Sequence, residues 1–216
     1  MASRVFADGN GDPSSLDRGM LIGPRLRHRR LELGMTAREL ARRVDCSPSL
    51  ISQVERGRAV PSVSTLWALV TALRISMDRL FDPAQDGPAT KEEDEPEDDA
   101  QATAGGPVLR RNARPRIRLE RGVVWERLTA MAEKEMEFLE VCYGVGQSAP
   151  EAEHAIQHNG QEYAVIIEGA LFTQIGFERY VLEVGDSLTF DSTIPHRFWN
   201  AGDVPARAIW VIINRH

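Results

Sequence analysis

Two histidines and one carboxylate in the C-terminal half have a spacing that could hold a metal ion. His158 and Glu162 lie four residues apart, so their side chains point to the same face if residues 156–167 form an extended strand. His196 follows in a second stretch of short strands. Two imidazoles and one carboxylate that converge make a facial triad, which suits Fe(II) or a similar divalent ion. We therefore predict these three residues as ligands for Fe, Zn, Ni or Mn. Alternatively, the histidines line a pocket and donate hydrogen bonds to an anionic effector without an ion.

The chain around these residues has the pattern of a β domain. Short apolar or alternating runs are separated by Gly, Pro, Asn and Asp, which is typical of a sandwich or barrel of short strands. The runs are Glu137–Tyr143, Tyr163–Ile167, Tyr180–Val184, Ser187–Phe190 and Ala208–Ile213. Alternation from the predicted metal ligands points Ala164, Ile166 and Phe198 inward. With Tyr143, they form the predicted lining of a small-molecule pocket.

The N-terminal part has helical periodicity and several helix starts. Thr36 and Glu39 form a capping box, and Ser47 precedes Pro48 as a second N-cap. Ser62 caps a further helix. We predict helices over residues 36–44, 48–56 and 62–74, one before Gly34, and a short fifth one capped by Ser76. The first two named are joined by the tight turn at residues 45–47, which makes a helix-turn-helix.

Charge and composition divide the chain. Residues 18–83 hold twelve Arg against six acidic residues, whereas residues 84–107 hold eight acidic residues against one Lys. A basic segment of this kind favours binding to a polyanion. The acidic stretch has no aliphatic residue larger than Ala, so it is predicted to be a flexible linker. The predicted domains are a disordered tail (1–19), a helical domain (20–83), the linker (84–107) and a β domain (108–216).

Composition excludes two classes of protein. The longest apolar run, Ala208–Ile213, is six residues, far short of the ~20 needed to cross a membrane. The two cysteines lie far apart in the chain, so no disulfide framework is expected. The first residues lack the apolar core of a secretory signal, and we expect a cytoplasmic protein.

Residues 21–81 resemble the five-helix DNA-binding domain of Cro/C1-type (xenobiotic-response-element) regulators. The run from Ile51 to Gly57, followed by Pro61, Ser62 and Leu66, matches the family strongly. The resemblance implies that the helix over 48–56 enters the major groove of double-stranded DNA. Ser49, Ser52 and Gln53 would then face base edges. The predicted backbone contacts are Thr36, Arg38, Ser47, Arg56 and Arg58. In the family, the pair matched by Arg30 and Glu55 ties two helices together.

The C-terminal part resembles the cupin family, a double-stranded β-helix barrel. His158, Glu162 and Gly169 match the first cupin motif, and Gly185, His196 and Asn200 match the second. The first histidine position of the family motif holds Ile156. His154 could replace it only if the strand bulges. The resemblance therefore implies an all-α five-helix domain followed by an all-β cupin barrel.

Two functions follow from these resemblances. The first is a sequence-specific DNA-binding transcriptional regulator, not an enzyme, whose cupin domain senses a small-molecule effector. It would bind an inverted-repeat operator as a homodimer. The second is an iron-dependent cupin oxygenase or epoxidase with a helix-turn-helix appendage, since hydroxypropylphosphonate epoxidase shares the layout. The intact DNA-reading residues favour the first.

Overall fold

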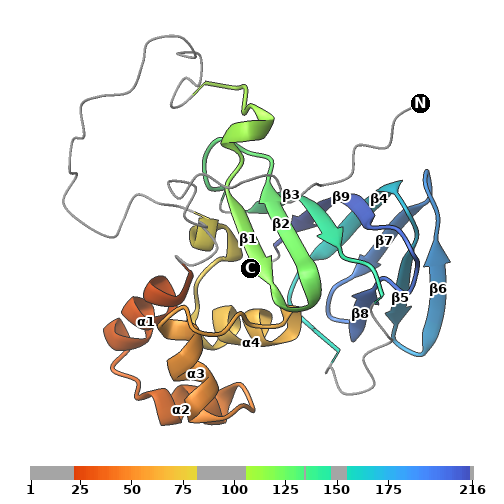
Figure 1. The fold of residues 1–216 in the computed structure, drawn as a ribbon. Helices are drawn as coiled ribbons and strands as arrows, with labels where there is room; N and C mark the ends of the chain where they lie inside the picture. The colour runs from red at the N-terminus through yellow and green to blue at the C-terminus, as the bar shows by residue number, and fades with distance from the viewer. Residues whose placement is uncertain (1–21, 82–105, 134, 147–154, 215–216) are drawn as a thin grey trace.

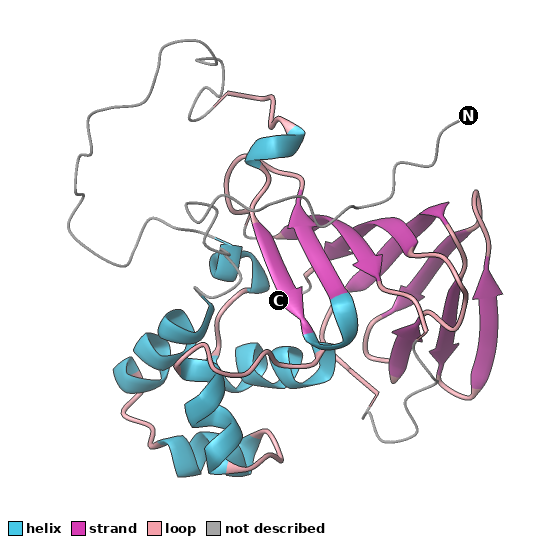
Figure 2. Cartoon of the chain, viewed as in Figure 1, coloured by secondary structure: helices cyan, strands magenta, loops and turns pink. Residues whose placement is uncertain are grey.

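The computed structural model describes residues 22–81, 106–133, 135–146 and 155–214. Within these ranges the N-terminal module is helical and the C-terminal module is largely β (Figures 1 and 2). The predicted tail and all but the last two residues of the predicted linker lie outside the described residues, as does His154.

The helical module follows the predicted cap positions closely. Thr36, Ser47 and Ser62 are N-caps whose hydroxyls each accept a hydrogen bond from the third following backbone N–H, at 3.1 Å. Gly34 has φ +65°, the left-handed conformation that ends the preceding helix. The helices are α1 (Ile22–Glu32), α2 (Ala37–Arg43), α3 (Pro48–Glu55) and α4 (Val63–Leu73).

Two details of the helical module differ from the prediction. The fifth element, η2 (Met77–Phe81), is a 3₁₀ helix, so the described module has four α-helices and one 3₁₀ turn. A segment of five residues is too short to gain from the cooperativity of an α-helix. The second detail concerns Glu39 of the predicted capping box. Its carboxylate lies 3.5 Å from Nη2 of Arg43, one helical turn later, and thus has a partner within α2.

The C-terminal module consists of two antiparallel sheets. The larger one has the strand order β1-β2-β3-β9-β4-β7, and the smaller one has the order β6-β5-β8. The strands are β1 (Arg116–Leu119), β2 (Val123–Arg127), β3 (Met136–Tyr143), β4 (Gln161–Glu168), β5 (Leu171–Ile175), β6 (Glu178–Leu182), β7 (Ser187–Asp191), β8 (His196–Trp199) and β9 (Ala206–Ile213). Two short 3₁₀ turns, η3 (Arg111–Ala113) and η4 (Glu120–Gly122), flank β1. A largely β domain is confirmed, and its closure into one barrel stays a prediction.

Alternation along the strands builds the space between the sheets. In β3 the buried side chains include Glu137, Leu139, Val141 and Tyr143, and in β9 they are Ala206, Ala208, Trp210 and Ile212. The strand expected over residues 156–167 begins only at Gln161, because Asn159 and Gly160 bend the chain. Ile156 instead forms an isolated antiparallel bridge with His196.

The two modules pack against each other. The backbone N–H of Glu120 in η4 donates to the carbonyl of Pro61, just before α4, at 3.0 Å. The Asp78 carboxylate of η2 accepts from the backbone N–H of Glu133 at 2.5 Å and lies 3.5 Å from Nη1 of Arg127. Helix α4 therefore lies beside the turn that joins β1 and β2 (Figure 1).

Candidate nucleic-acid interface and metal centre

Helix α3 presents polar side chains to solvent. Seven of the eight predicted DNA contacts are exposed and Ser52 is half-buried. On α3 itself, the Gln53 side-chain amide donates to the Ser49 hydroxyl at 3.2 Å, which holds the two predicted base-reading groups together. The hydroxyls of Thr36 and Ser47 serve as helix caps. That they also contact the phosphates of the DNA backbone stays a prediction.

A buried ion pair fixes α3 against α1. Arg30 donates through Nε and Nη2 to the two carboxylate oxygens of Glu55, at 2.6 and 2.8 Å. Its Nη1 donates to the carbonyl of Met35 at 2.7 Å. The hydrogen bonds that Arg30 donates to Glu55 outweigh burial and raise the pKa of Arg30. The structure thus contains the pair that the Cro/C1 resemblance implies, and it holds α3 in one orientation.

His158, Glu162 and His196 converge between the two sheets. One ligand atom from each lies within 4.8 Å of the other two. Oε1 of Glu162 lies 2.8 Å from Nε2 of His158 and 3.1 Å from Nε2 of His196. All three side chains are almost completely buried.

The donor atoms fit a divalent ion. Both Nε2 atoms and the Glu162 Oε1 are buried without an aligned hydrogen-bond partner among the described residues. Two neighbouring ligands on one face of an octahedron lie about 3.0 Å apart when each metal bond is ~2.1 Å. The two separations from Glu162, 2.8 and 3.1 Å, match this spacing, and the three ligand atoms lie within 4.8 Å of one another, so the donor set suits an ion.

Outer contacts orient two of the three ligands. Nδ1 of His196 lies 2.8 Å from the carbonyl of Ile194, which leaves Nε2 free for a ligand role when Nδ1 carries the proton. The Trp210 indole N–H donates to Oε2 of Glu162 at 2.7 Å. Burial would raise the pKa of Glu162, but its contacts with His158 and His196 outweigh burial and lower the pKa to about 2. Glu162 is therefore a carboxylate at neutral pH.

The other cupin-motif positions are not ligands in this structure. Ile156 lies beside the centre and gives it an apolar wall where the family motif has a histidine. Asn200 is fully buried and structural, because its amide donates to the carbonyls of Tyr143 and Val204 and accepts from the N–H of Gly202.

Comparisons with known proteins agree with both modules. The helix-turn-helix family model matches residues 26–80, and the cupin domain model matches residues 139–212. The uncharacterized HTH-type transcriptional regulator y4dJ of Sinorhizobium fredii is 36% identical over 73 residues, which are 34% of this chain and 95% of that protein. The chain belongs to the helix-turn-helix transcriptional regulators.

Two matches that cover most of the regulator's chain agree with this family. It is 26% identical to the HTH-type transcriptional regulator PuuR of Escherichia coli over 192 residues, covering 85% of this chain and 90% of PuuR. It also has the fold of a crystal structure of an HTH_3 family transcriptional regulator from Vibrio cholerae. That match has a TM-score of 0.58 and 17% identity, and covers 92% of this chain and 97% of the other. In the described part of the regulator, no helix is long and apolar enough to cross a membrane.

The inner cavity of the regulator lies between the sheets, and α4 forms one of its walls. Its lining comprises Val63, Trp67, Trp125, Leu139, Val141, Tyr143, Ile156, Glu162, Phe198, Trp210 and Ile212. Of the predicted pocket residues, Tyr143 and Phe198 line it, whereas Ala164 and Ile166 are buried in the apolar core nearby. The cavity has a volume of about 30 Å³, enough for one or two water molecules.

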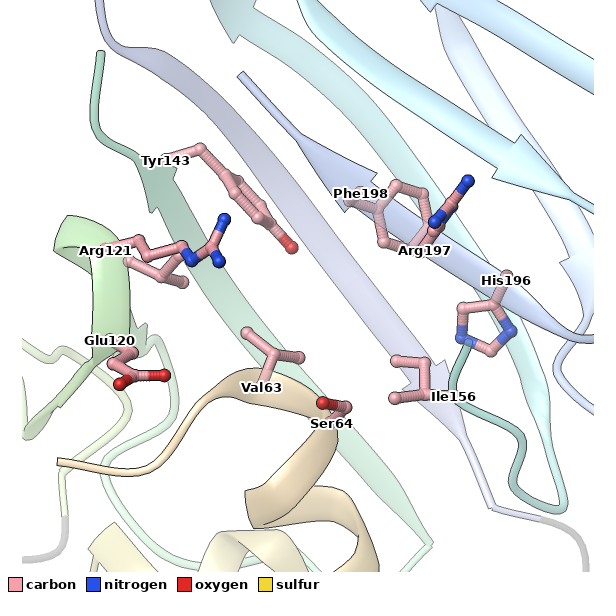
Figure 3. Close-up of a pocket in the computed structure, with 10 residues that line it drawn as sticks. Val63, Ser64, Glu120, Arg121, Tyr143, Ile156, His196, Arg197 and Phe198 are labelled. Atoms are coloured by element: carbon pink, nitrogen blue, oxygen red, sulfur yellow. The ribbon is translucent and has the colours of Figure 1, made fainter. Parts of the chain in front are cut away.

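Several lining residues were not predicted from the sequence, and three of them are polar or aromatic side chains next to the candidate metal centre. Arg121 and Arg197 line a second pocket beside the inner cavity, together with Tyr143 and His196 (Figure 3). Trp67 of α4 stacks on the His158 ring with a centroid distance of 4.0 Å and an interplanar angle of 3°. A second apolar stripe on α4, formed by Val63 and Trp67 at i and i+4, is the sequence signal that could have revealed this contact.

Proposed function

We propose that the regulator reads an operator through α3 and that its cupin module senses a small molecule at the His158, Glu162 and His196 centre. The observation that carries this proposal is the combination of an exposed, rigidly held recognition helix with a buried and unsatisfied donor set in a separate module. Because its proposed target is DNA, we expect the protein to act in the cytoplasm.

On the DNA side, the two kinds of contact have different consequences. Gln53 is suited to a bidentate hydrogen bond with adenine, and Ser49 and Ser52 can serve as donors or acceptors. Arg56 and Arg58 would neutralise phosphates, which fixes the position of the helix without reading sequence. Arg38 at the start of α2 would do the same.

On the cupin side, a divalent ion would be held by the three residues and would supply a Lewis-acidic point of attachment for an oxygen donor of the effector. Trp210 and the carbonyl of Ile194 would keep Glu162 and His196 in position. Fe, Zn, Ni and Mn all accept such a mixed nitrogen and oxygen set.

Binding to two half-sites requires a dimer. The outer face of the larger sheet is a candidate surface for dimerisation. Tyr163, Val165 and Ile167 of β4 point to its outer face with exposed fractions of 43%, 37% and 39%. Val211 and Ile209 of β9 pair with the first two of these positions and extend the same apolar face. A continuous exposed apolar face marks an interaction site, and a two-fold dimer that binds both half-sites must hold its recognition helices about 34 Å apart.

An iron-dependent oxygenase is the second candidate, and the observation that favours it is the convergence of two histidines and one carboxylate, whose ligand atoms lie within 4.8 Å of one another. Turnover of a small molecule by the metal-loaded chain, in the absence of any preference among DNA sequences, would establish that function instead.

Selection of bound duplexes from a random pool tests the proposed function. The full chain is expected to enrich an inverted repeat. Gln53→Ala should relax the preference at one base pair by ~1–3 kcal/mol. Arg58→Ala should weaken binding to all sequences and reduce the salt slope by about 1. Arg79→Ala on η2 is the matched control, since it removes the same charge from the same module away from α3 and should leave the operator preference unchanged.

A pool without any enriched sequence would reject operator recognition. An enriched sequence that Gln53→Ala leaves unchanged would reject the orientation proposed for α3.

A further inference from the structure

A side chain of the DNA-binding module forms one wall of the inner cavity of the cupin module. Trp67 belongs to α4, yet its indole lies against the His158 ring at 4.0 Å and meets Trp125 edge-on at 6.4 Å. Only 8% of Trp67 is exposed. The indole therefore occupies the volume next to the candidate metal centre that a ligand would need.

The remaining space is too small for an effector. With the indole in place, the cavity holds about 30 Å³, whereas small-molecule sites have volumes of ~300–1,000 Å³. The walls opposite Trp67 come from packed strands whose side chains are buried, such as Leu139, Val141 and Trp210. Densely packed strands cannot open without losing their hydrogen bonds, so α4 is the wall that can move as a unit.

We propose that Trp67 is an interdomain plug: the cupin cavity takes a ligand only when Trp67 withdraws, so ligand binding and the docking of α4 exclude each other. This inference rests on the proposed function only in that the cupin module is taken to bind a small molecule. The ligand that fits is a planar, largely apolar or aromatic molecule, because it replaces an indole that lies between the His158 ring and Trp125.

The exclusion gives the two modules a defined coupling. A ligand that binds only the undocked state shifts the population toward it, and docking in turn lowers the apparent affinity for the ligand. Asp78 and Arg127 form another buried contact between the modules, on the η2 side. Neither residue lines the cavity, so a ligand bound in the cavity would not touch this contact.

Free indole, a copy of the plug itself, is the first probe. The full chain with Trp67→Ala should bind indole at least about tenfold more tightly than the unmodified chain, because the competing docked state is lost. Trp199→Phe is the matched control, since Trp199 is buried against Phe172 away from the plug, and its affinity should equal that of the unmodified chain. Equal affinities for the Trp67→Ala and unmodified chains would overturn the proposal.

A distance measurement separates a plug from a simple cavity. Spin labels at Arg42→Cys on α2 and Glu178→Cys on β6, with Cys46→Ser and Cys142→Ser, report the position of the helical module. Val141→Phe fills the cavity from the cupin side and leaves Trp67 intact. It should lengthen or broaden the label distance relative to the unmodified sequence. A label distance unchanged in Val141→Phe would also overturn the proposal. Leu139→Phe serves the same purpose if Val141→Phe does not fold.

These outcomes are independent of operator recognition. A chain that selects an operator but binds indole equally with and without Trp67 keeps the proposed function and loses the plug. A chain that selects no operator, but in which Trp67→Ala tightens indole binding and Val141→Phe moves the label, keeps the plug and loses the proposed function.

Discussion

Replacing Glu137 by Gln is expected to stabilise the protein in a pH-dependent way. Glu137 is 3% exposed on the inward face of β3, and its Oε2 has no hydrogen-bond partner among the described residues. Burial raises the pKa of Glu137, a hydrogen bond from Asn214 offsets part of this rise, and the charges of Asp78 and Glu162 add to it, so that the pKa is about 8. The native state therefore holds a proton that the unfolded chain releases near pH 4.5.

The sign and size follow from proton linkage. Between about pH 4.5 and 8 the folded chain binds one more proton at this site than the unfolded chain, so stability falls by about 1.4 kcal/mol per pH unit as pH rises. At pH 7 the accumulated cost of Glu137 is about 3 kcal/mol. Glu137→Gln is neutral at every pH and should remove both the cost and this part of the slope.

Urea unfolding at half-unit intervals from pH 5 to 8, on metal-free protein, measures this effect. Glu140→Gln on the same strand is the matched control with the opposite sign. Burial would raise the pKa of Glu140, but Arg207 and Arg114 outweigh it and lower the pKa, so its ionised form stabilises the fold above pH 4.5. Glu140→Gln should therefore destabilise at pH 7. Parallel stability curves for Glu137→Gln and the unmodified chain would refute the assignment of a buried, protonated Glu137.

Three further predictions concern the other modules and surfaces. Elemental analysis of protein purified without chelator should find about one divalent ion per chain, and Glu162→Ala should abolish it; equal metal content in both samples would contradict the three-residue site. Arg30→Ala should lower the free energy of unfolding by about 3 kcal/mol, because it leaves the buried Glu55 carboxylate unpaired, whereas the double change Arg30→Met and Glu55→Met should cost less in urea unfolding. Val165→Lys should convert dimers to monomers in sedimentation and weaken operator binding, and retention of the dimer would exclude the β4 face as the interface.

Features determined by neighbouring residues could be predicted from the sequence. The caps at Thr36, Ser47 and Ser62 depend on one side chain and a backbone N–H three residues later, so local spacing sufficed. The same holds for strand alternation, which correctly pointed Ala164 and Ile166 inward. The convergence of Glu162 with His196 required the resemblance to cupins, because no local rule relates residues that are 34 positions apart.

The features that the sequence analysis missed depend on packing between modules. Trp67 fits the helical periodicity of α4 well enough to be read as an ordinary core residue, and its partner His158 lies in the other module. Glu137 shares the alternation of Leu139, Val141 and Tyr143, which points it inward, but only the assembled sheets show that a carboxylate there is 3% exposed. Burial of this kind is a property of the assembled fold, and periodicity alone does not report it.

The candidate metal centre and the helical module meet at the side chain of His158. His196 is held by the carbonyl of Ile194, whereas neither ring nitrogen of His158 has an aligned hydrogen-bond partner among the described residues. The orientation of His158 is therefore determined by its contact with Glu162 on one edge and by the Trp67 indole on its face. An ion held by the three residues would fix the direction of Nε2, and any rotation of the His158 ring that this required would change the surface on which Trp67 stacks. Because Trp67 belongs to the same bundle of helices as α3, this contact would couple ion binding at the candidate metal centre to the position of the proposed recognition helix.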